Sequence, residues 1–199
     1  MSGRGLPYFE EQEYHKFLLS EERLGIFKPE DYLRQIEWKG IKNLLDFGMG
    51  NGFFLPFFYP FLDVECSIWG AECQELLIDY TLQLKVKENL RNFIPFYVDR
   101  TEHPLLPDWL PEFDLIFCSC TLSTFADPSL AIKGIGRGLK ENGKIIVLDW
   151  AKMDSPGGIP NISQKVSFDR MEYFIEEAEF KITKKLKTSP YLYSVIIEK

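Results

Sequence analysis

Apolar and polar segments alternate along the chain in an order that predicts strands and helices in turn. Short apolar runs bounded by turn residues are typical of buried strands, and longer amphipathic or apolar segments between them are typical of helices. This alternation predicts an α/β protein with a mainly parallel sheet. The expected strands are residues 42–48, 66–72, 92–99, 113–120 and 143–150, and the expected helices are 30–38, 52–62, 73–90, 128–140 and 168–180.

The end of the chain follows a different pattern. Residues 180–199 contain two strand-like runs that are separated by only a few residues around Ser189-Pro190. Parallel neighbours need a crossover of about a dozen residues or more, so these two runs are expected to form an antiparallel hairpin. The sequence therefore predicts a mainly parallel sheet that ends in an antiparallel hairpin.

A tight glycine loop, Gly48-Met49-Gly50-Asn51-Gly52, follows the first strand, and Asp46 closes that strand. Glycines let a ligand approach the backbone, and amides at a helix start point toward it. A phosphate-binding P-loop is excluded because no lysine follows the last glycine. A dinucleotide fingerprint is disfavoured because Phe53 stands where its third glycine is needed for close packing. The carboxylate of Asp46 suits a ligand with an ammonium group, or it braces the loop.

The composition of the chain limits the classes of binding partner that we expect. Acidic residues outnumber basic ones by 30 to 23, so the net charge is −7 and nucleic acid is not expected as the main partner. The longest apolar run, residues 53–62, is about half of the roughly 20 residues that a membrane helix needs. We therefore expect no stable membrane insertion and no secretory signal, and a cytoplasmic protein with reduced cysteines. Cys118 and Cys120 lack a second ligand pair nearby, so no metal is expected, and their thiols should pack on the two sides of a strand.

Residues 46–52 resemble the first motif of class I S-adenosylmethionine-dependent methyltransferases, especially the type 11 group that includes quinone-biosynthesis enzymes. Three further stretches match in order, and the resemblance covers residues 24–199. It implies a Rossmann-like α/β fold with a seven-stranded, mostly parallel sheet, an antiparallel last strand and helices on both faces. It also implies a methyltransferase domain at residues 29–199, preceded by an N-terminal segment, residues 1–28, that forms a lid over the active site.

The same resemblance implies the site. Asp46 would support the ammonium group of S-adenosylmethionine or the loop, Glu72 would accept from the ribose hydroxyls, and Asp99 from the adenine amino group. Ser119 would lie near the amino-acid end of the donor and near the acceptor. The full set of cofactor-binding residues is Asp46, Gly48, Met49, Gly50, Gly52, Glu72, Cys73, Asp99, Arg100 and Ser119.

Candidate substrate residues are His15, Tyr14 and Trp150. A solvated N-terminal arm is the simpler explanation for the first two, and core packing explains Trp150 as well as a pocket wall does. Many relatives carry a histidine just past the fourth strand where this chain has Ser123-Thr124, so no histidine base is expected there. Methyl transfer relies mainly on proximity and alignment, and no catalytic dyad is identified.

The expected function is methyl transfer from S-adenosylmethionine to a small-molecule acceptor, with S-adenosylhomocysteine released. Two alternatives are a non-catalytic protein that keeps this fold to bind partners and an NAD-dependent oxidoreductase, which Phe53 and the terminal hairpin oppose. The identity of the acceptor and the oligomeric state stay open.

Overall fold

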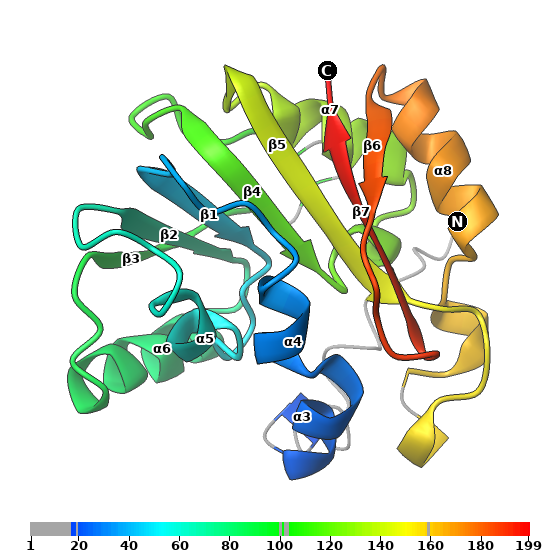
Figure 1. Cartoon of the computed structure of the whole chain (residues 1–199), viewed down its shortest axis with the longest axis horizontal. Helices are drawn as coiled ribbons and strands as arrows, with labels where there is room; N and C mark the ends of the chain where they lie inside the picture. Colours follow the sequence, from blue (N-terminus) through cyan, green and yellow to red (C-terminus); the bar gives the residue numbers. More distant parts are fainter. Residues whose placement is uncertain (1–16, 19, 100, 102–103, 159) are drawn as a thin grey trace.

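A twisted sheet with helices on both sides organises the chain in the computed structural model (Figure 1). The structure describes residues 17–18, 20–99, 101, 104–158 and 160–199. The strands lie in the order β3-β2-β1-β4-β5-β7-β6. They are β1 (Asn43–Phe47), β2 (Ser67–Glu72), β3 (Phe93–Tyr97), β4 (Phe113–Ser119), β5 (Leu139–Trp150), β6 (Lys181–Lys185) and β7 (Leu192–Glu198).

Strand pairing follows the predicted topology. β1 is parallel to β2 and β4, β2 is parallel to β3, and β4 is parallel to β5. Among the described strands β7 alone runs against the others, since it is antiparallel to both β5 and β6. The predicted seven-stranded, mostly parallel sheet with an antiparallel last strand is confirmed.

Helices cover the two faces of the sheet. α4, α5 and α6 pack on one face, and α7 and α8 pack on the other. Within the described ranges, no helix combines the length and the apolar content that crossing a bilayer requires. The α-helices are α3 (Glu21–Phe27), α4 (Pro29–Leu33), α5 (Leu55–Phe58), α6 (Glu75–Lys87), α7 (Pro128–Gly136) and α8 (Phe168–Glu177), and the 3₁₀ turns are η1 (Leu122–Thr124), η2 (Pro156–Gly158) and η3 (Ile162–Gln164).

The two cores differ in composition. On the α5 face, Phe117 of β4 packs edge-on against the stacked rings of Phe54 and Phe58, with centroids 4.8 and 5.2 Å away. The opposite face is filled mainly by aliphatic side chains such as Ile116 and Val147. Alternate side chains along each strand point into the two core layers, as a sheet buried on both sides requires. The aromatic run after the glycine loop is therefore mostly core.

Local sequence explains where α7 begins. Asp127 caps the helix by accepting from the Ser129 backbone N–H at 2.9 Å, and Pro128 takes the first position. Asp at the cap and Pro at the first helical position are the favoured residues there.

Several predicted boundaries were wrong. The helix expected at residues 52–62 is only the four-residue α5, because Pro60 has no N–H with which to continue the ladder. The helix expected at 30–38 ends as α4 at Leu33. The helix expected at 128–140 ends at Gly136, within a glycine-rich stretch. Residues 139–142 already belong to β5, where the predicted Asn142-Gly143 turn is instead an irregularity in its pairing with β4.

Candidate active site

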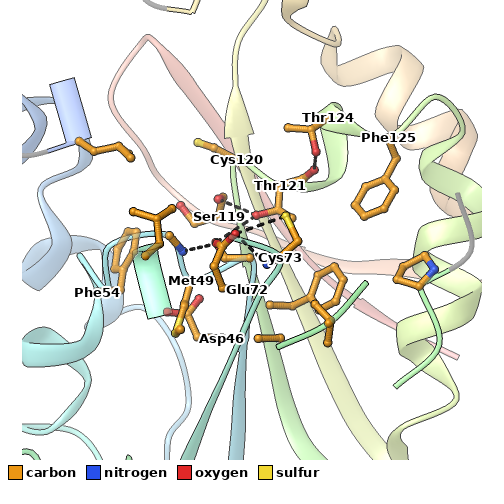
Figure 2. A pocket seen from close by; sticks show the side chains of 18 of the residues that line it. Asp46, Met49, Phe54, Glu72, Cys73, Ser119, Cys120, Thr121, Thr124 and Phe125 are labelled. Atoms are coloured by element: carbon orange, nitrogen blue, oxygen red, sulfur yellow. Dashed lines mark hydrogen bonds between the residues drawn. The ribbon is translucent and has the colours of Figure 1, made fainter. Parts of the chain in front are cut away.

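A pocket opens at the carboxyl ends of β1, β2 and β4, the edge at which open α/β sheets bind ligands (Figure 2). It encloses about 940 Å³ of space, its open mouth included. Gly52 is not among its lining residues, and Arg100, Tyr14 and His15 lie outside the described residues. The predicted site residues that line it are Asp46, Gly48, Met49, Gly50, Glu72, Cys73, Asp99, Ser119 and Trp150.

The glycine loop has the backbone conformation that glycine permits. Gly48 and Gly50 have φ angles of +73° and +58°, in the left-handed region. A side chain at Gly48 would overlap that of Thr121, whereas the space around Gly50 is open. The N–H groups of Gly48 and Met49 both donate to the carbonyl oxygen of Ala71, at 2.9 and 3.1 Å. The loop is thus anchored to β2 and presents bare backbone to the pocket.

Two of the predicted loop residues also support the packing below the pocket. A Cβ at Gly52 would lie 2.7 Å from Leu55 Cδ1 and 3.2 Å from Thr81 Cγ2, so its missing side chain makes room for α5 and α6. Met49 buries its side chain, and a Cβ at Gly70 would overlap its sulfur. Gly52 therefore lets the loop pack closely against α5 and α6.

Glu72 connects the loop to the turn after β2. One carboxylate oxygen accepts from Gly50 N–H at 2.9 Å. The other accepts from Cys73 N–H at 2.8 Å and Gln74 N–H at 3.0 Å. The carboxylate is buried and can only accept hydrogen bonds when ionised. It therefore holds the loop and suits hydroxyl donors of a ligand.

Asp46 lies at the end of β1, and its side chain is 2% exposed. Burial raises the pKa of Asp46 to about 7, while the nearby positive charge of Arg23 opposes that rise. The negative charge of Glu72 adds to it. A cationic ligand group beside Asp46 would favour its ionised form.

Arg23 is a pocket residue that the sequence reasoning missed. It comes from α3, within the N-terminal segment, and is buried in the pocket wall. Its Nη1 donates to Asn51 Oδ1 at 3.0 Å and to the Leu18 carbonyl oxygen at 3.3 Å. The polar sequence around Arg23 does not indicate that its side chain is buried in a pocket wall. A long-range contact with the glycine loop places it there.

The end of β4 supplies a polar group and an unusual backbone. The Ser119 hydroxyl is buried, and it has no hydrogen bond of normal geometry to the described part of the protein. Cys120 has a φ angle of +55°, a conformation that is uncommon for a residue with a side chain and that gathers at functional sites. Cys118 and Cys120 belong to the cores on opposite faces of the sheet, as predicted.

Trp150 belongs to an aromatic wall of the pocket. Its ring lies 5.5 Å from Phe27 in an edge-to-face arrangement and 5.8 Å from Phe17. Asp149 fixes the backbone here, since its carboxylate accepts from Trp150 N–H and from the Ser123 hydroxyl, both at 2.8 Å. Ser123, in the segment where no histidine base was expected, therefore has a structural partner.

Asp99 lies just past the end of β3, lines the pocket and is exposed. Val98, Pro104 and Phe125 also line the pocket, and the Phe125 ring is stacked on Phe47 with centroids 6.3 Å apart. Apolar side chains together with a carboxylate acceptor suit a flat heterocycle with an amino group.

The sheet order and a pocket beside a glycine loop define the class I methyltransferase architecture. A family described as a methyltransferase domain matches residues 39–174, more than half of the chain. The chain belongs to this family.

Solved structures share the fold. A SAM-dependent methyltransferase from Aquifex aeolicus has a TM-score of 0.81 and 24% identity, with 92% of this chain and 95% of that one covered. An O-methyltransferase from neocarzinostatin biosynthesis, solved with S-adenosyl-L-homocysteine and 1,4-dihydroxy-2-naphthoic acid, has a TM-score of 0.72 and 13% identity, with 90% of this chain and 56% of that one covered.

A curated relative is the ribosomal RNA small subunit methyltransferase G of Malacoplasma penetrans (strain HF-2), 30% identical over 146 residues. The match covers 69% of this chain and 55% of that protein, so the chain spans about half the length of that relative. Family and fold confirm the predicted class, an S-adenosylmethionine-dependent methyltransferase, and with it the predicted cofactor.

Proposed function

We propose that this protein transfers a methyl group from S-adenosylmethionine to a small, largely apolar acceptor and releases S-adenosylhomocysteine. The observation that carries the proposal is the division of the pocket. Carboxylates and glycine backbone line one part of it, and the rings of Phe17, Phe27 and Trp150 line another.

The residues present fit the cofactor. Asp46 offers a carboxylate for an ammonium group, and Glu72 offers acceptor oxygens for ribose hydroxyls. Gly50 lines the pocket with open space where a Cβ would stand, so a ligand can approach the backbone there. The Ser119 hydroxyl, buried without a hydrogen bond of normal geometry to the described residues, indicates that a ligand group completes its environment.

When bound, the cofactor supplies a reactive methyl group on a positively charged sulfur. The task of the protein is then to hold the acceptor close and aligned, and proximity alone can contribute several kcal/mol. Phe17, Phe27 and Trp150 would exclude water and orient a planar acceptor by ring contacts. We assign no general base, because a base is needed only for a hydroxyl or a protonated amine.

The N-terminal segment, residues 1–28, acts in this proposal as a lid on the domain at residues 29–199. Its described part supports that role, since Phe17, Leu18, Arg23 and Phe27 all line the pocket. Closing the pocket with these side chains would shield the reacting groups from water.

A second candidate acceptor is RNA, which the match to a ribosomal RNA methyltransferase favours. The net charge of −7 opposes it, because RNA-binding surfaces are normally basic. A non-catalytic binding protein is the remaining alternative, and it would bind the donor without turnover.

The test is label transfer from methyl-labelled S-adenosylmethionine to hydroxynaphthoic acids, phenols, thiols and amines, beside small-subunit ribosomal RNA. The proposal predicts label in a small molecule. Label in RNA alone would establish the second candidate, and donor binding with no transfer to any acceptor would favour the binding protein.

A matched pair of tryptophan variants locates the acceptor. Trp150→Leu should reduce turnover while leaving S-adenosylhomocysteine affinity within about twofold, because Trp150 lies in the aromatic wall. Trp109→Leu should change neither quantity, since Trp109 is 62% exposed and does not line the pocket.

A further inference from the structure

The segment that leads from β5 to α8, drawn in yellow in Figure 1, carries a buried cation next to the aromatic wall. Lys165 is 4% exposed, and its Nζ lies over the Trp150 ring, 5.3 Å from the ring centroid. The same Nζ donates to the carbonyl oxygen of Met153 at 2.7 Å. Lys165 does not itself line the pocket, whereas Trp150 does. The cation therefore adjoins the pocket through a tryptophan of its wall.

The charge of Lys165 has no salt-bridge partner among the described residues. Its ammonium group has three donors, and Met153 accepts from one of them. Burial lowers the pKa of Lys165, and the negative charge of Asp154 opposes that change without forming a salt bridge. Burying an ammonium group without a counter-charge is costly, so an anion near Lys165 would be favoured.

The positive charge of Lys165 also acts on a second residue of the pocket. Burial raises the pKa of the Cys120 thiol, and Lys165 is among the groups whose charge opposes this rise. Cys120 lines the pocket at the end of β4, and its N–H donates to the carbonyl oxygen of Leu148 in β5 at 2.7 Å. Cys120 and Trp150 thus follow neighbouring strands, and the field of Lys165 acts on that side of the pocket.

Acidic residues line the pocket from other strands. Asp46, Glu72 and Asp99 come from the ends of β1, β2 and β3. Asp149, the buried acid next to the wall, does not line the pocket, and its carboxylate already accepts from Trp150 N–H. A positively charged donor suits the acidic side, and a negatively charged acceptor suits the side next to the lysine.

We propose that the acceptor is an aromatic acid in its ionised form and that Lys165 gives the pocket its preference for that charge. The proposal rests on the proposed function and deepens it, since it adds one negative charge to an otherwise apolar acceptor. Trp150 and the rings around it would hold the flat part of the acceptor, and the nearby ammonium group would favour the anion. Lys165 acts here as a specificity residue and not as a catalytic one.

The experiment compares benzoate with benzyl alcohol, a probe of similar shape that lacks the charge. Both are titrated by calorimetry into the full chain saturated with S-adenosylhomocysteine. The wild type should prefer benzoate by about tenfold, as expected for a charge in partly buried surroundings. Lys165→Met keeps an apolar chain over Trp150 and removes the charge, so it should abolish the preference by weakening benzoate alone. Lys165→Arg keeps the charge and should retain most of the preference.

A matched control separates this role from the net charge of the protein. Lys152 belongs to the same segment, is exposed and does not line the pocket, so Lys152→Met should leave the preference unchanged. Thermal melts establish that each variant is folded. If Lys165 had only a structural role, Lys165→Met would weaken benzoate and benzyl alcohol equally, and that result would overturn the proposal.

The wild type provides a test that does not depend on how any variant folds. Equal affinity for the two probes, a preference for benzyl alcohol, or binding of neither would overturn the proposal, while bound S-adenosylhomocysteine would leave the proposed function intact. A wild type that binds no S-adenosylhomocysteine would overturn the proposed function first. A preference for benzoate that depends on Lys165, in a protein that methylates no acceptor, would support the anion site and overturn the enzymatic function.

Discussion

Two adjacent segments follow β1 and differ in what they contribute to the structure. They are the glycine loop (residues 48–52) and the aromatic run (residues 53–58). Loop glycines have positive φ angles and bond through their backbone to Ala71 and Glu72. The aromatic run contributes volume instead, and Phe54 and Phe58 are almost fully buried against Phe117.

The difference shows that the site depends on backbone conformation and the core on side-chain volume. Changes at run residues that do not line the pocket, such as Phe58, should therefore cost stability and spare ligand affinity, whereas changes in the loop should impair affinity as well. Four substitutions test this separation, taken from the largest expected effect to the smallest.

Phe58→Ala should lower the free energy of unfolding by about 3–5 kcal/mol, because it leaves a cavity among fully buried rings. Chemical denaturation measures this loss. The folded variant should still bind S-adenosylhomocysteine with affinity within about twofold of the wild type, as Phe58 does not line the pocket. A large loss of affinity at full folding would break the separation.

Gly48→Ala should cost about 2–4 kcal/mol, since the left-handed conformation disfavours a side chain and the new methyl group would overlap Thr121. Relief of that overlap would move the loop, so donor affinity should fall by at least about tenfold. Denaturation and calorimetric titration together measure both effects. Wild-type affinity in this variant would show that the loop does not shape the site.

Asp46→Asn should move stability and affinity in opposite directions. The pKa of Asp46 is raised to about 7, so between pH 4 and 7 the folded state keeps a proton that the unfolded state has lost. Stability therefore falls as pH rises through this window, by about 1.4 kcal/mol per unit at most. The variant should be more stable than the wild type by about 2–3 kcal/mol at pH 8, with little difference near pH 4.

The same substitution should weaken donor binding at pH 8, because the amide cannot pair with an ammonium group. Melting temperatures at several pH values, with titrations at pH 8, measure the two effects. If the variant is less stable than the wild type at pH 8, the conclusion that burial disfavours the ionised form of Asp46 is wrong.

Gly50→Ala should have the smallest effect, about 1 kcal/mol, because Gly50 shares the positive φ angle of Gly48 but has open space around it. It is the matched control for Gly48→Ala. Equal losses for the two variants would mean that backbone strain alone, without the Thr121 overlap, governs the loop.

Much of the fold was predictable because periodicity and turn residues are local signals. The alternating elements, the terminal hairpin and the position of Asp46, Gly48 and Glu72 at one edge all follow from strand and helix order. Helix ends were not predictable in the same way. The 52–62 segment is apolar throughout, so its hydrophobic pattern does not mark the helix ends, and Pro60 is the local signal for where the helix stops.

The glycine-loop motif predicted residues that the structure places around one pocket, and their roles in binding stay predictions. Arg23 was missed because only the folded chain brings α3 to Asn51 and the glycine loop. Asp149 and Ser123 were likewise invisible as partners, since they lie 26 residues apart and meet only when η1 folds against the end of β5. The roles predicted for Tyr14, His15 and Arg100 stay predictions, because these residues lie outside the described part of the chain.

The measurement that tests the central claim most directly is calorimetric titration of the wild type, Glu72→Ala and Glu75→Ala with S-adenosylhomocysteine. We expect one-to-one binding to the wild type and a loss of at least about tenfold in Glu72→Ala, since charged acceptors contribute about 1.5–3 kcal/mol per hydrogen bond. Glu75 is exposed and does not line the pocket, so Glu75→Ala should bind like the wild type. A folded wild type that binds no S-adenosylhomocysteine, or a Glu72→Ala variant with unchanged affinity, would contradict the account.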